Sequence, residues 1–472
     1  MTELWQASAA DLVRLYAAGE ASPVEALDAC LARAEAVNPA LNALVLTDRP
    51  GAAVAAAESE ARWRRREPLG PLDGVPLTVK DSIRTAGLPS TFGSRLYAGE
   101  IPERDETPVR RVREAGTVLL GKTNVPEFTV QGYTSNPSFG TTRNPWNPAL
   151  TPGGSSGGAV ASVAAGIGPL ALGTDGGGSI RRPASHAGLV GLKPSAGRVP
   201  RRDGFPPVLL DFEVIGPLAR TVADLSTAMG FLAMPDPKEA PRPGSGAIAP
   251  MPMPSRKRIL YVPTFAGAPV DPEIAGSVAD AAAHLAALGH DVEESRSFTV
   301  ADRINGLWPV FGQVGIAWLM GRFAGRDAEL GPDIRAIAEA GRAVSATAYF
   351  DALEAAFAVR EAMASFFAGH DLLLTPSAAA LPWPADETHP TTISGQPVGP
   401  RGSAIFTGFV NAAGCPAISI PCRPSAAGLP IGFQLVGPWG ADETLIGIAA
   451  SYEAAHPWPM LWDRYGAGLG PG

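Results

Sequence analysis

The stretch TPGGSSGGAVASVAAGIGPLALGTDGGGSIRRPASHAGLVGLK, residues 151–193, decides the fold of this chain and contains its chemistry. Its first glycine-rich turn, 153–158, opens an alanine-rich helix that we expect to run to about Gly166. Its second turn, 176–178, follows a short apolar run over 169–173 with strand character. Each turn therefore presents a serine beside free backbone N–H groups.

Ser179 follows three consecutive glycines and is the candidate nucleophile of the stretch. Glycines let main chain come within hydrogen-bond distance of a ligand, because no Cβ intervenes and positive φ is accessible without strain. A carbonyl carbon above the Ser179 hydroxyl would have its oxygen facing several amides, as a developing oxyanion requires. A serine hydroxyl is a poor nucleophile until a neighbouring base removes its proton. The chain must therefore also supply a base.

The composition bounds the fold and the class of function. The 472 residues are 46% hydrophobic and 18% charged, so the chain can bury a large core. Strand patterns alternate with helical ones and no linker divides the motifs, so we expect one α/β domain with a mixed sheet covered by helices on both faces. The net charge of −8 lacks the basic excess that nucleic-acid binding requires. The proline-rich segment 236–257 is expected to be an exposed connection.

The three cysteines, Cys30, Cys415 and Cys422, show no CxxC spacing and no zinc pattern. This usage indicates a reducing compartment and argues against a disulfide framework. The longest apolar run, 159–173, contains a proline and several glycines and is too short to span a bilayer. We therefore expect a cytoplasmic protein without a membrane contact.

The N-terminal region predicts two surface helices and no signal peptide, because it lacks an unbroken apolar run. Pro23 stands at the first position of the second helix, and Asn38-Pro39 is expected to end that helix. Each helix begins with a serine followed three residues later by an acid, as in a capping box: Ser8 with Asp11, and Ser22 with Glu25.

The segment GVPLTVKD, 74–81, predicts a strand with Val75, Leu77 and Val79 on one face and Lys80 at its end. Lysine is rare in this chain, with five lysines against 33 arginines. A desolvated lysine can lose its proton and act as a base, whereas arginine stays protonated. Such a lysine needs a fall of about 3 in its pKa, roughly 4 kcal/mol. The alternative is a lysine at a strand end that reaches solvent.

The segment GTVLLGKT, 116–123, matches the phosphate-loop pattern of nucleotide-binding proteins. Its variable positions, 117–120, are β-branched residues and leucines, and they predict a strand instead of a loop. Pro126 would also interrupt the helix whose N-terminus has to hold phosphate. We therefore expect no nucleotide site here, and nucleotide binding stays the most remote alternative.

The segment 153–157 satisfies GxSxG, the nucleophile elbow of α/β-hydrolases, but a proline-broken loop precedes it where that motif needs a strand. His186 is close to Ser179 in sequence and is expected to pack or cap locally. The other histidines lie in segments without a triad context: His284, His290, His370, His389 and His456. A Ser-His-Asp triad is thus poorly supported.

The strings GGSSGG, LALGTDGGGSIRRPA and GLVGLKPS resemble the amidase signature family of serine hydrolases. The resemblance continues in family order through LDGVPLTVKD, GKTNVPEF, TTRNPWNP, VIGPLARTVADL, NAAGCPAISIP and GLPIGFQLVGP. It covers about 70–230 and 370–455, with a variable region at about 232–370 that would supply the substrate pocket. It implies one amidase domain over 1–472, with the amidase signature fold.

The resemblance implies a Ser, cis-Ser, Lys triad. Ser179 matches the nucleophile, Ser155 matches the serine with the cis peptide bond, and Lys80 matches the base. The residue chemistry agrees, because one hydroxyl can accept a proton while it gives another. Ser179 would attack the carbonyl of an amide, and water would then hydrolyse the acyl-enzyme.

By the same likeness, the backbone N–H groups of Gly176, Gly177, Gly178 and Ser179 would form the oxyanion hole. Asp175 with Arg181 or Arg182 would brace that turn, and Thr174 and Ser156 would add hydrogen bonds. Gly176 departs from the family pattern, in which a larger residue often stands at this position. The departure either loosens the hole or widens access to it.

The favoured activity is hydrolysis of aryl or alkyl amides, with carbamates (urethanes) and esters as close alternatives, because one oxyanion hole serves all three carbonyls. The resemblance implies no metal or organic cofactor, a small-molecule substrate, and a monomer or homo-oligomer. The alternative from another class is the A-type glutaminase of a glutamyl-tRNA amidotransferase, which works in a complex. The aromatic segments 305–323 and 405–409, and Cys415, would line the pocket or belong to the core.

Overall fold

A mixed β-sheet forms the centre of the protein, as the computed structural model describes it over residues 3–238 and 255–472. Within these ranges the sheet has eleven strands, in the order β1-β3-β2-β6-β8-β7-β14-β15-β11-β9-β10. The strands are β1 (Leu44–Thr47), β2 (Pro76–Lys80), β3 (Val118–Thr123), β6 (Leu170–Asp175), β7 (Val190–Lys193), β8 (Val214–Ala219), β9 (Arg258–Tyr261), β10 (Asp291–Glu294), β11 (Leu372–Pro376), β14 (Ala417–Cys422) and β15 (Ile431–Val436). Two short hairpins stand apart: β4 (Ser135–Asn136) with β5 (Gly140–Thr141), and β12 (Thr392–Ile393) with β13 (Gln396–Pro397).

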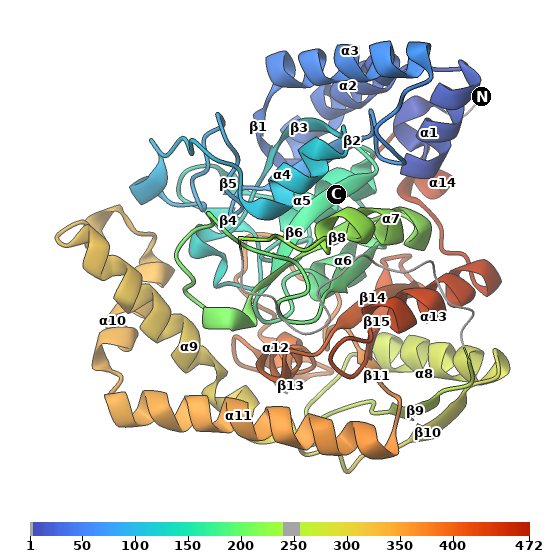
Figure 1. The fold of residues 1–472 in the computed structure, drawn as a ribbon. Coiled ribbons are helices and arrows are strands. Elements are labelled where there is room, and N and C mark those ends of the chain that lie inside the picture. Colours follow the sequence, from blue (N-terminus) through green and yellow to red (C-terminus); the bar gives the residue numbers. More distant parts are fainter. Residues whose placement is uncertain (1–2, 239–254) are drawn as a thin grey trace.

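Helices lie on both sides of this sheet (Figure 1). One group of helices packs into the core on one face: α1 (Ala9–Ala18), α4 (Thr107–Glu114), α7 (Val222–Leu232), α8 (Pro272–Ala287) and α13 (Asp442–Ala455). The other face is covered by α2 (Pro23–Leu41), α3 (Arg49–Arg65), α5 (Gly157–Ala165), α6 (Arg181–Ala187), α9 (Asp302–Met320), α10 (Pro332–Ala343), α11 (Ala346–Gly369) and α12 (Gly408–Ala413). A short helix, α14 (Leu461–Tyr465), lies near the C-terminus. The predicted single α/β domain with a mixed sheet is confirmed.

Side-chain alternation along each strand explains why both faces are covered. Leu372 and Leu374 of β11 belong to one core cluster, and Leu373 between them belongs to the cluster on the other face. In β6, Leu170 and Ala171 divide between two clusters in the same way. A strand that is buried on both faces is nearly continuously apolar, because successive side chains point to opposite sides.

The order of the strands places the two motifs of the sequence side by side. β2 and β6 are adjacent and parallel, with Leu77 opposite Leu170 and Val79 opposite Leu172. The carboxyl ends of parallel neighbours meet at the same edge of a sheet. Lys80, the last residue of β2, therefore lies beside the turn that follows β6.

The local predictions around the signature stretch are largely confirmed. The alanine-rich helix is α5, which ends at Gly166 in a left-handed cap, and the apolar run is β6. The segment 118–123 of the phosphate-loop pattern is the buried strand β3, and Lys122 inside it donates to the carbonyl of Ile83 at 2.5 Å. The pattern is therefore structural and forms no phosphate-wrapping loop.

Two details at the N-terminus differ from the prediction. Helix α2 does not end at Asn38-Pro39 but continues to Leu41. A proline in the last turn removes only one backbone N–H, so the helix can continue past it. The Asn38 Oδ1 then accepts the N–H groups of Ala43 and Leu44, which follow the helix, at 2.8 Å each. Of the two predicted capping boxes, the one at Ser22 forms in full. At Ser8 the hydroxyl caps the N–H of Asp11, but the Asp11 carboxylate accepts from that same hydroxyl instead of from the backbone.

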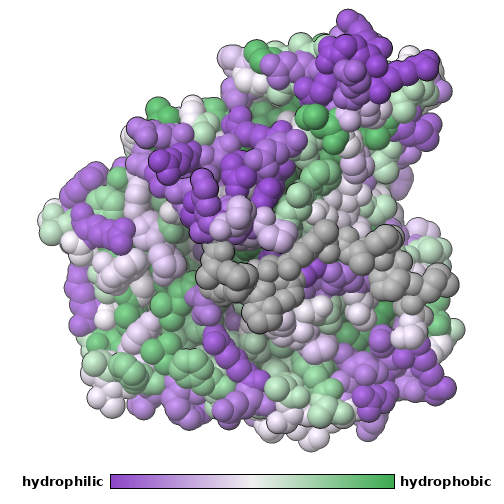
Figure 2. All heavy atoms as spheres, viewed as in Figure 1, coloured by the Kyte–Doolittle hydropathy of each residue, from purple (hydrophilic) through white to green (hydrophobic). Residues whose placement is uncertain are grey.

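None of the described helices is long and apolar enough to cross a membrane. Figure 2 shows hydrophilic side chains gathered over the end of the molecule that carries α3, whose last turns hold Arg62, Arg64 and Arg65. Hydrophobic side chains are visible over the region of α11, the helix whose Phe350 and Phe357 are 69% and 57% exposed. Of the proline-rich segment predicted to be an exposed connection, residues 239–254 lie outside the described residues.

Candidate active site

The Lys80 amine lies completely buried at the end of β2. Its Nζ contacts the Ser155 hydroxyl at 2.8 Å and the Thr174 hydroxyl at 2.7 Å. Burial lowers the pKa of Lys80 to about 7, although the negative charges of Glu213 and Asp175 oppose the fall. Near neutral pH the amine therefore carries a lone pair for a large fraction of the time. The alternative of a lysine that reaches solvent is wrong for this residue.

Ser155 belongs to the turn before α5, and the Gly154–Ser155 peptide bond is cis. The neighbouring Ser156 joins this turn to the second one, because its N–H donates to the Ser179 carbonyl at 3.2 Å. The Ser156 hydroxyl donates to the Thr174 carbonyl at 3.1 Å. Within the described residues no direct hydrogen bond links the Ser155 and Ser179 hydroxyls, and the two turns meet through Ser156.

The glycine turn after β6 is wrapped around the Asp175 carboxylate. Asp175 accepts the N–H of Gly178 at 2.7 Å and the N–H of Ile180 at 3.1 Å. The Gly178 N–H is thereby bonded to Asp175, so it is not free for the oxyanion hole in which it was predicted. The N–H groups of Gly176, Gly177 and Ser179 meet no acceptor among the described residues.

Asp175 forms its ion pair with Arg181, and Arg182 makes no hydrogen bond or ion pair with Asp175. The Arg181 guanidinium contacts both carboxylate oxygens of Asp175 at 2.9 Å, and both side chains are fully buried. Burial alone would raise the pKa of Asp175, but the Arg181 charge holds it far below its usual value. Arg181 also donates to Gln434 at 2.8 Å and to Asn411 at 2.6 Å. Neither amide was among the predicted site residues, although each lies in a segment that carries the resemblance.

A cavity of about 670 Å³ opens above Ser179, Gly176 and Gly177. The space beside Gly176 that a larger residue would occupy is filled by Leu209, whose Cδ1 lies 2.5 Å from the position of a Cβ at residue 176. The predicted aromatic segments divide between wall and core. Trp308 lines the cavity, whereas the 405–409 phenylalanines are buried in the core.

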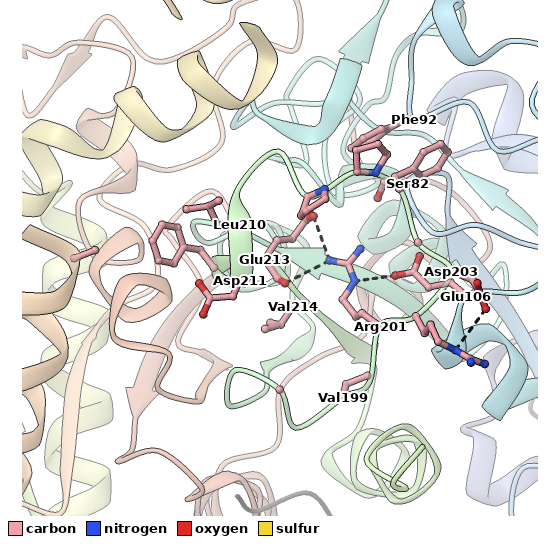
Figure 3. Close-up of a pocket in the computed structure, with 18 of the residues that line it drawn as sticks. Ser82, Phe92, Glu106, Val199, Arg201, Asp203, Leu210, Asp211, Glu213 and Val214 are labelled. Carbon is pink, nitrogen blue, oxygen red and sulfur yellow. Dashed lines mark hydrogen bonds and ion pairs between the residues drawn. The ribbon is translucent and has the colours of Figure 1, made fainter. Parts of the chain in front are cut away.

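A second cavity, of about 800 Å³, is lined by Glu106, Arg201 and Glu213 among other residues (Figure 3). Figure 3 shows Arg201 between Glu106 and Glu213, with its Nε 2.8 Å from a Glu106 oxygen and its Nη1 3.2 Å from a Glu213 oxygen. Glu213 raises and Arg201 lowers the pKa of Lys80, so this ion pair sets part of the field at the amine. No motif of the sequence points to this network.

The remaining candidates lie apart from the triad geometry. His186 is buried, and its Nε2 lies 3.1 Å from the Ala380 carbonyl, as expected for a locally packed histidine. Cys415 is part of the core cluster and does not border the cavity. No group of three or more His, Cys, Asp or Glu side chains in the described ranges is arranged to hold a metal ion.

Comparison with known proteins places this geometry among amidases. The family model described as Amidase matches residues 25–446. The chain is 36% identical to the A-type subunit of the glutamyl-tRNA(Gln) amidotransferase of Synechococcus sp. (strain CC9605), covering 93% of this chain and 94% of that one. The same protein of Moorella thermoacetica (strain ATCC 39073 / JCM 9320) is 35% identical, over 96% of this chain and 97% of that one.

Amide hydrolases are among the solved structures that resemble it. The structure of 6-aminohexanoate cyclic dimer hydrolase complexed with substrate has a TM-score of 0.85 at 31% identity, covering 97% of this chain and 98% of that one. A bacterial aryl acylamidase of the amidase signature enzymes has a TM-score of 0.85 at 30% identity, covering 96% of each chain.

The buried ion pair below the glycine turn yields a prediction of stability. Asp175→Asn leaves the Arg181 charge buried without compensation, which should lower the free energy of unfolding by about 3–5 kcal/mol. Asp291→Asn, which breaks an exposed pair with Arg256, is the matched control and should barely move the unfolding midpoint. Urea titration of both variants measures the difference. Equal midpoints for the two variants would contradict a structural role for the buried pair.

Proposed function

Since the chain belongs to the amidase signature family, we propose that it is a serine amidohydrolase that cleaves aryl or alkyl amides through an acyl-enzyme on Ser179. The observation that carries the proposal is the buried amine of Lys80, 2.8 Å from the hydroxyl of Ser155, whose neighbour Ser156 donates its N–H to the Ser179 carbonyl. The proposed domain is the whole chain, 1–472, with residues from the 232–370 region, such as Trp308, on the pocket wall.

In the proposed mechanism, neutral Lys80 accepts the Ser155 proton across their short contact, while Ser155 accepts the proton of Ser179. A rotation of the Ser179 hydroxyl closes the relay when substrate binds, since catalytic hydrogen bonds tighten in the Michaelis complex. Ser179 Oγ then forms a bond to the carbonyl carbon. The same relay returns the proton to the departing amine, and a water molecule later releases the acid from Ser179 by the reverse route.

The proposed oxyanion hole consists of the backbone N–H groups of Gly176, Gly177 and Ser179. These donors have no acceptor among the described residues, whereas that of Gly178 is bonded to Asp175. The buried pair of Asp175 and Arg181 fixes the turn before the reaction, so the donors need no reorganisation when charge develops. Carbamates and esters present the same carbonyl to the same donors and are included as secondary substrates.

A glutaminase that works inside a tRNA amidotransferase is the second candidate, because the curated relatives at 36% and 35% identity are named as components of that enzyme. Two measurements separate it from a stand-alone amidase: glutaminase activity of the purified chain, and partner proteins that co-purify with it. Release of ammonia from glutamine together with a bound partner would favour the amidotransferase. Turnover of p-nitroanilides by the isolated chain, without glutamine cleavage, would favour the stand-alone hydrolase.

The lowered pKa of Lys80 predicts the direction in which kcat/KM changes with pH. The amine is the base only when neutral, so kcat/KM should rise tenfold per pH unit below about pH 7 and level off above it. The measurement is kcat/KM for one p-nitroanilide between pH 5.5 and 9. A profile that stays flat over this range, or that falls as the pH rises, would rule out Lys80 as the base.

Removal of the nucleophile gives the second kinetic prediction. Ser179→Ala should lower kcat by at least about 10³-fold and abolish labelling by a fluorophosphonate, because it removes the hydroxyl that forms the acyl-enzyme in the proposed mechanism. Ser185→Ala, in the same helix region, is the matched control and should label as the wild type does. Substantial turnover by folded Ser179→Ala would defeat the proposed mechanism.

A further inference from the structure

Arg181 and Arg182 are consecutive in the sequence and follow the nucleophile closely, but they differ in the hydrogen bonds that their guanidinium groups make. The Arg181 guanidinium is fully bonded to Asp175, Gln434 and Asn411. The Arg182 side chain is 94% buried, yet its guanidinium makes no hydrogen bond and no ion pair within the described part of the chain. A buried charge is costly unless it is paired. The Asp175 carboxylate, which Arg181 already binds, acts on the Arg182 charge, but no carboxylate of the described residues forms an ion pair with Arg182.

The Arg182 guanidinium lies at the wall of the cavity that contains Ser179. Its Nε lies 2.7 Å from the position that a Cβ would take on Gly178, and its Nη1 lies 2.8 Å from the corresponding position on Gly132. A side chain at either glycine, one of which lies in the nucleophile turn, would therefore collide with the guanidinium, and the absence of both side chains makes space for it. The charge is held close to the reacting atoms by main chain on both sides.

A second arginine without a carboxylate partner faces the same cavity. Arg401 is partly buried, and its guanidinium carbon lies 5.9 Å from the centre of the Trp308 ring. Its Nη2 is buried and meets no acceptor among the described residues. Burial, followed by the positive charge of Arg182, lowers the pKa of Arg401 to about 9. The two guanidinium groups are therefore close enough to repel each other.

The rest of the cavity wall does not neutralise this charge. Asp333 is the one carboxylate among the described lining residues, and it is exposed and accepts hydrogen bonds from Tyr133 at 2.9 Å and from Gln131 at 3.5 Å. His389 also lines the cavity, and its ring contacts Thr388. The interior wall thus carries two positive charges and no buried negative one.

We propose that Arg182 and Arg401 bind a carboxylate of the substrate, so that this enzyme prefers amides with a carboxylate near the scissile bond. The inference rests on the proposed function and names its substrate class. A carboxylate would satisfy the fork of donors on Arg182 and would relieve the repulsion between two like charges that face one cavity. Neutral amides would leave both guanidinium groups unpaired.

The test compares amides that differ only in this charge. Succinyl- and glutaryl-p-nitroanilide carry a carboxylate on the acyl side, and butyryl- and valeryl-p-nitroanilide carry a methyl group in its place. N-Butyrylglycine and N-ethylbutyramide form the corresponding pair on the amine side. We expect kcat/KM of the wild type to favour the carboxylate member of at least one pair by roughly tenfold to a hundredfold. The pair that shows the preference tells on which side of the bond the carboxylate lies.

Variants assign this preference to the arginines. Arg182→Gln should remove most of the preference and Arg401→Gln a part of it, whereas Arg182→Lys should keep a part, because the charge remains. Arg256→Gln, at an exposed arginine that does not line the cavity, is the matched control and should leave the preference unchanged. Fluorophosphonate labelling of Ser179 at the wild-type rate shows that a variant is folded and has an intact nucleophile.

A measurement on the wild type alone covers the case in which Arg182→Gln does not fold. Succinamate should slow fluorophosphonate labelling of Ser179, and butyramide at the same concentration should not. If the wild type is labelled and cleaves both members of every pair equally well, the carboxylate subsite is overturned while the proposed hydrolase stands. If the folded wild type is neither labelled nor active on any amide, the proposed function itself fails.

Discussion

The burial of one amine against one hydroxyl is the constraint on which the site depends. Lys80 shares burial and a lowered pKa with Lys122 and Lys193, whose pKa values fall to about 8. Lys122 and Lys193 donate to the backbone carbonyls of Ile83 and Pro194, so their surroundings are structural. Only Lys80 of these three meets the hydroxyl of a serine in the signature stretch. Burial supplies the neutral amine, and the contact with Ser155 gives that amine a proton to accept.

The sheet and one ion pair hold the parts of the site together. The parallel pairing of β2 and β6 sets Lys80 beside Thr174, and the turn after β6 then carries Ser179. Arg181 binds Asp175 and also reaches Gln434 and Asn411, more than 220 residues further along the chain. The C-terminal segments therefore fix the glycine turn from behind. This explains why segments at both ends of the chain carry the family resemblance although the reacting groups lie in its first half.

The sequence predicted the groups whose chemistry is tied to a motif, and it could not predict contacts made by the fold. Lys80, Ser155 and Ser179 were predicted from motifs, and the structure brings the turns that carry them together. The Gly178 N–H was predicted to join the oxyanion hole, but in the structure it donates to Asp175. The number of glycines in a turn does not tell which of its N–H groups a nearby carboxylate accepts. Arg181 and Arg182 look alike in the sequence, and only packing separates the bonded guanidinium from the unpaired one. Arg401 follows no motif, and its place at the cavity depends on a loop far along the chain.

A crystal structure of the protein after reaction with a fluorophosphonate tests the central claim most directly. The account predicts a phosphorus bonded to Ser179 Oγ, with the phosphoryl oxygen about 2.7–3.1 Å from two or more of the N–H groups of Gly176, Gly177 and Ser179. It also predicts that Lys80 Nζ stays bonded to the Ser155 hydroxyl. An adduct on another residue, or a phosphoryl oxygen turned away from the glycine turn, would contradict it.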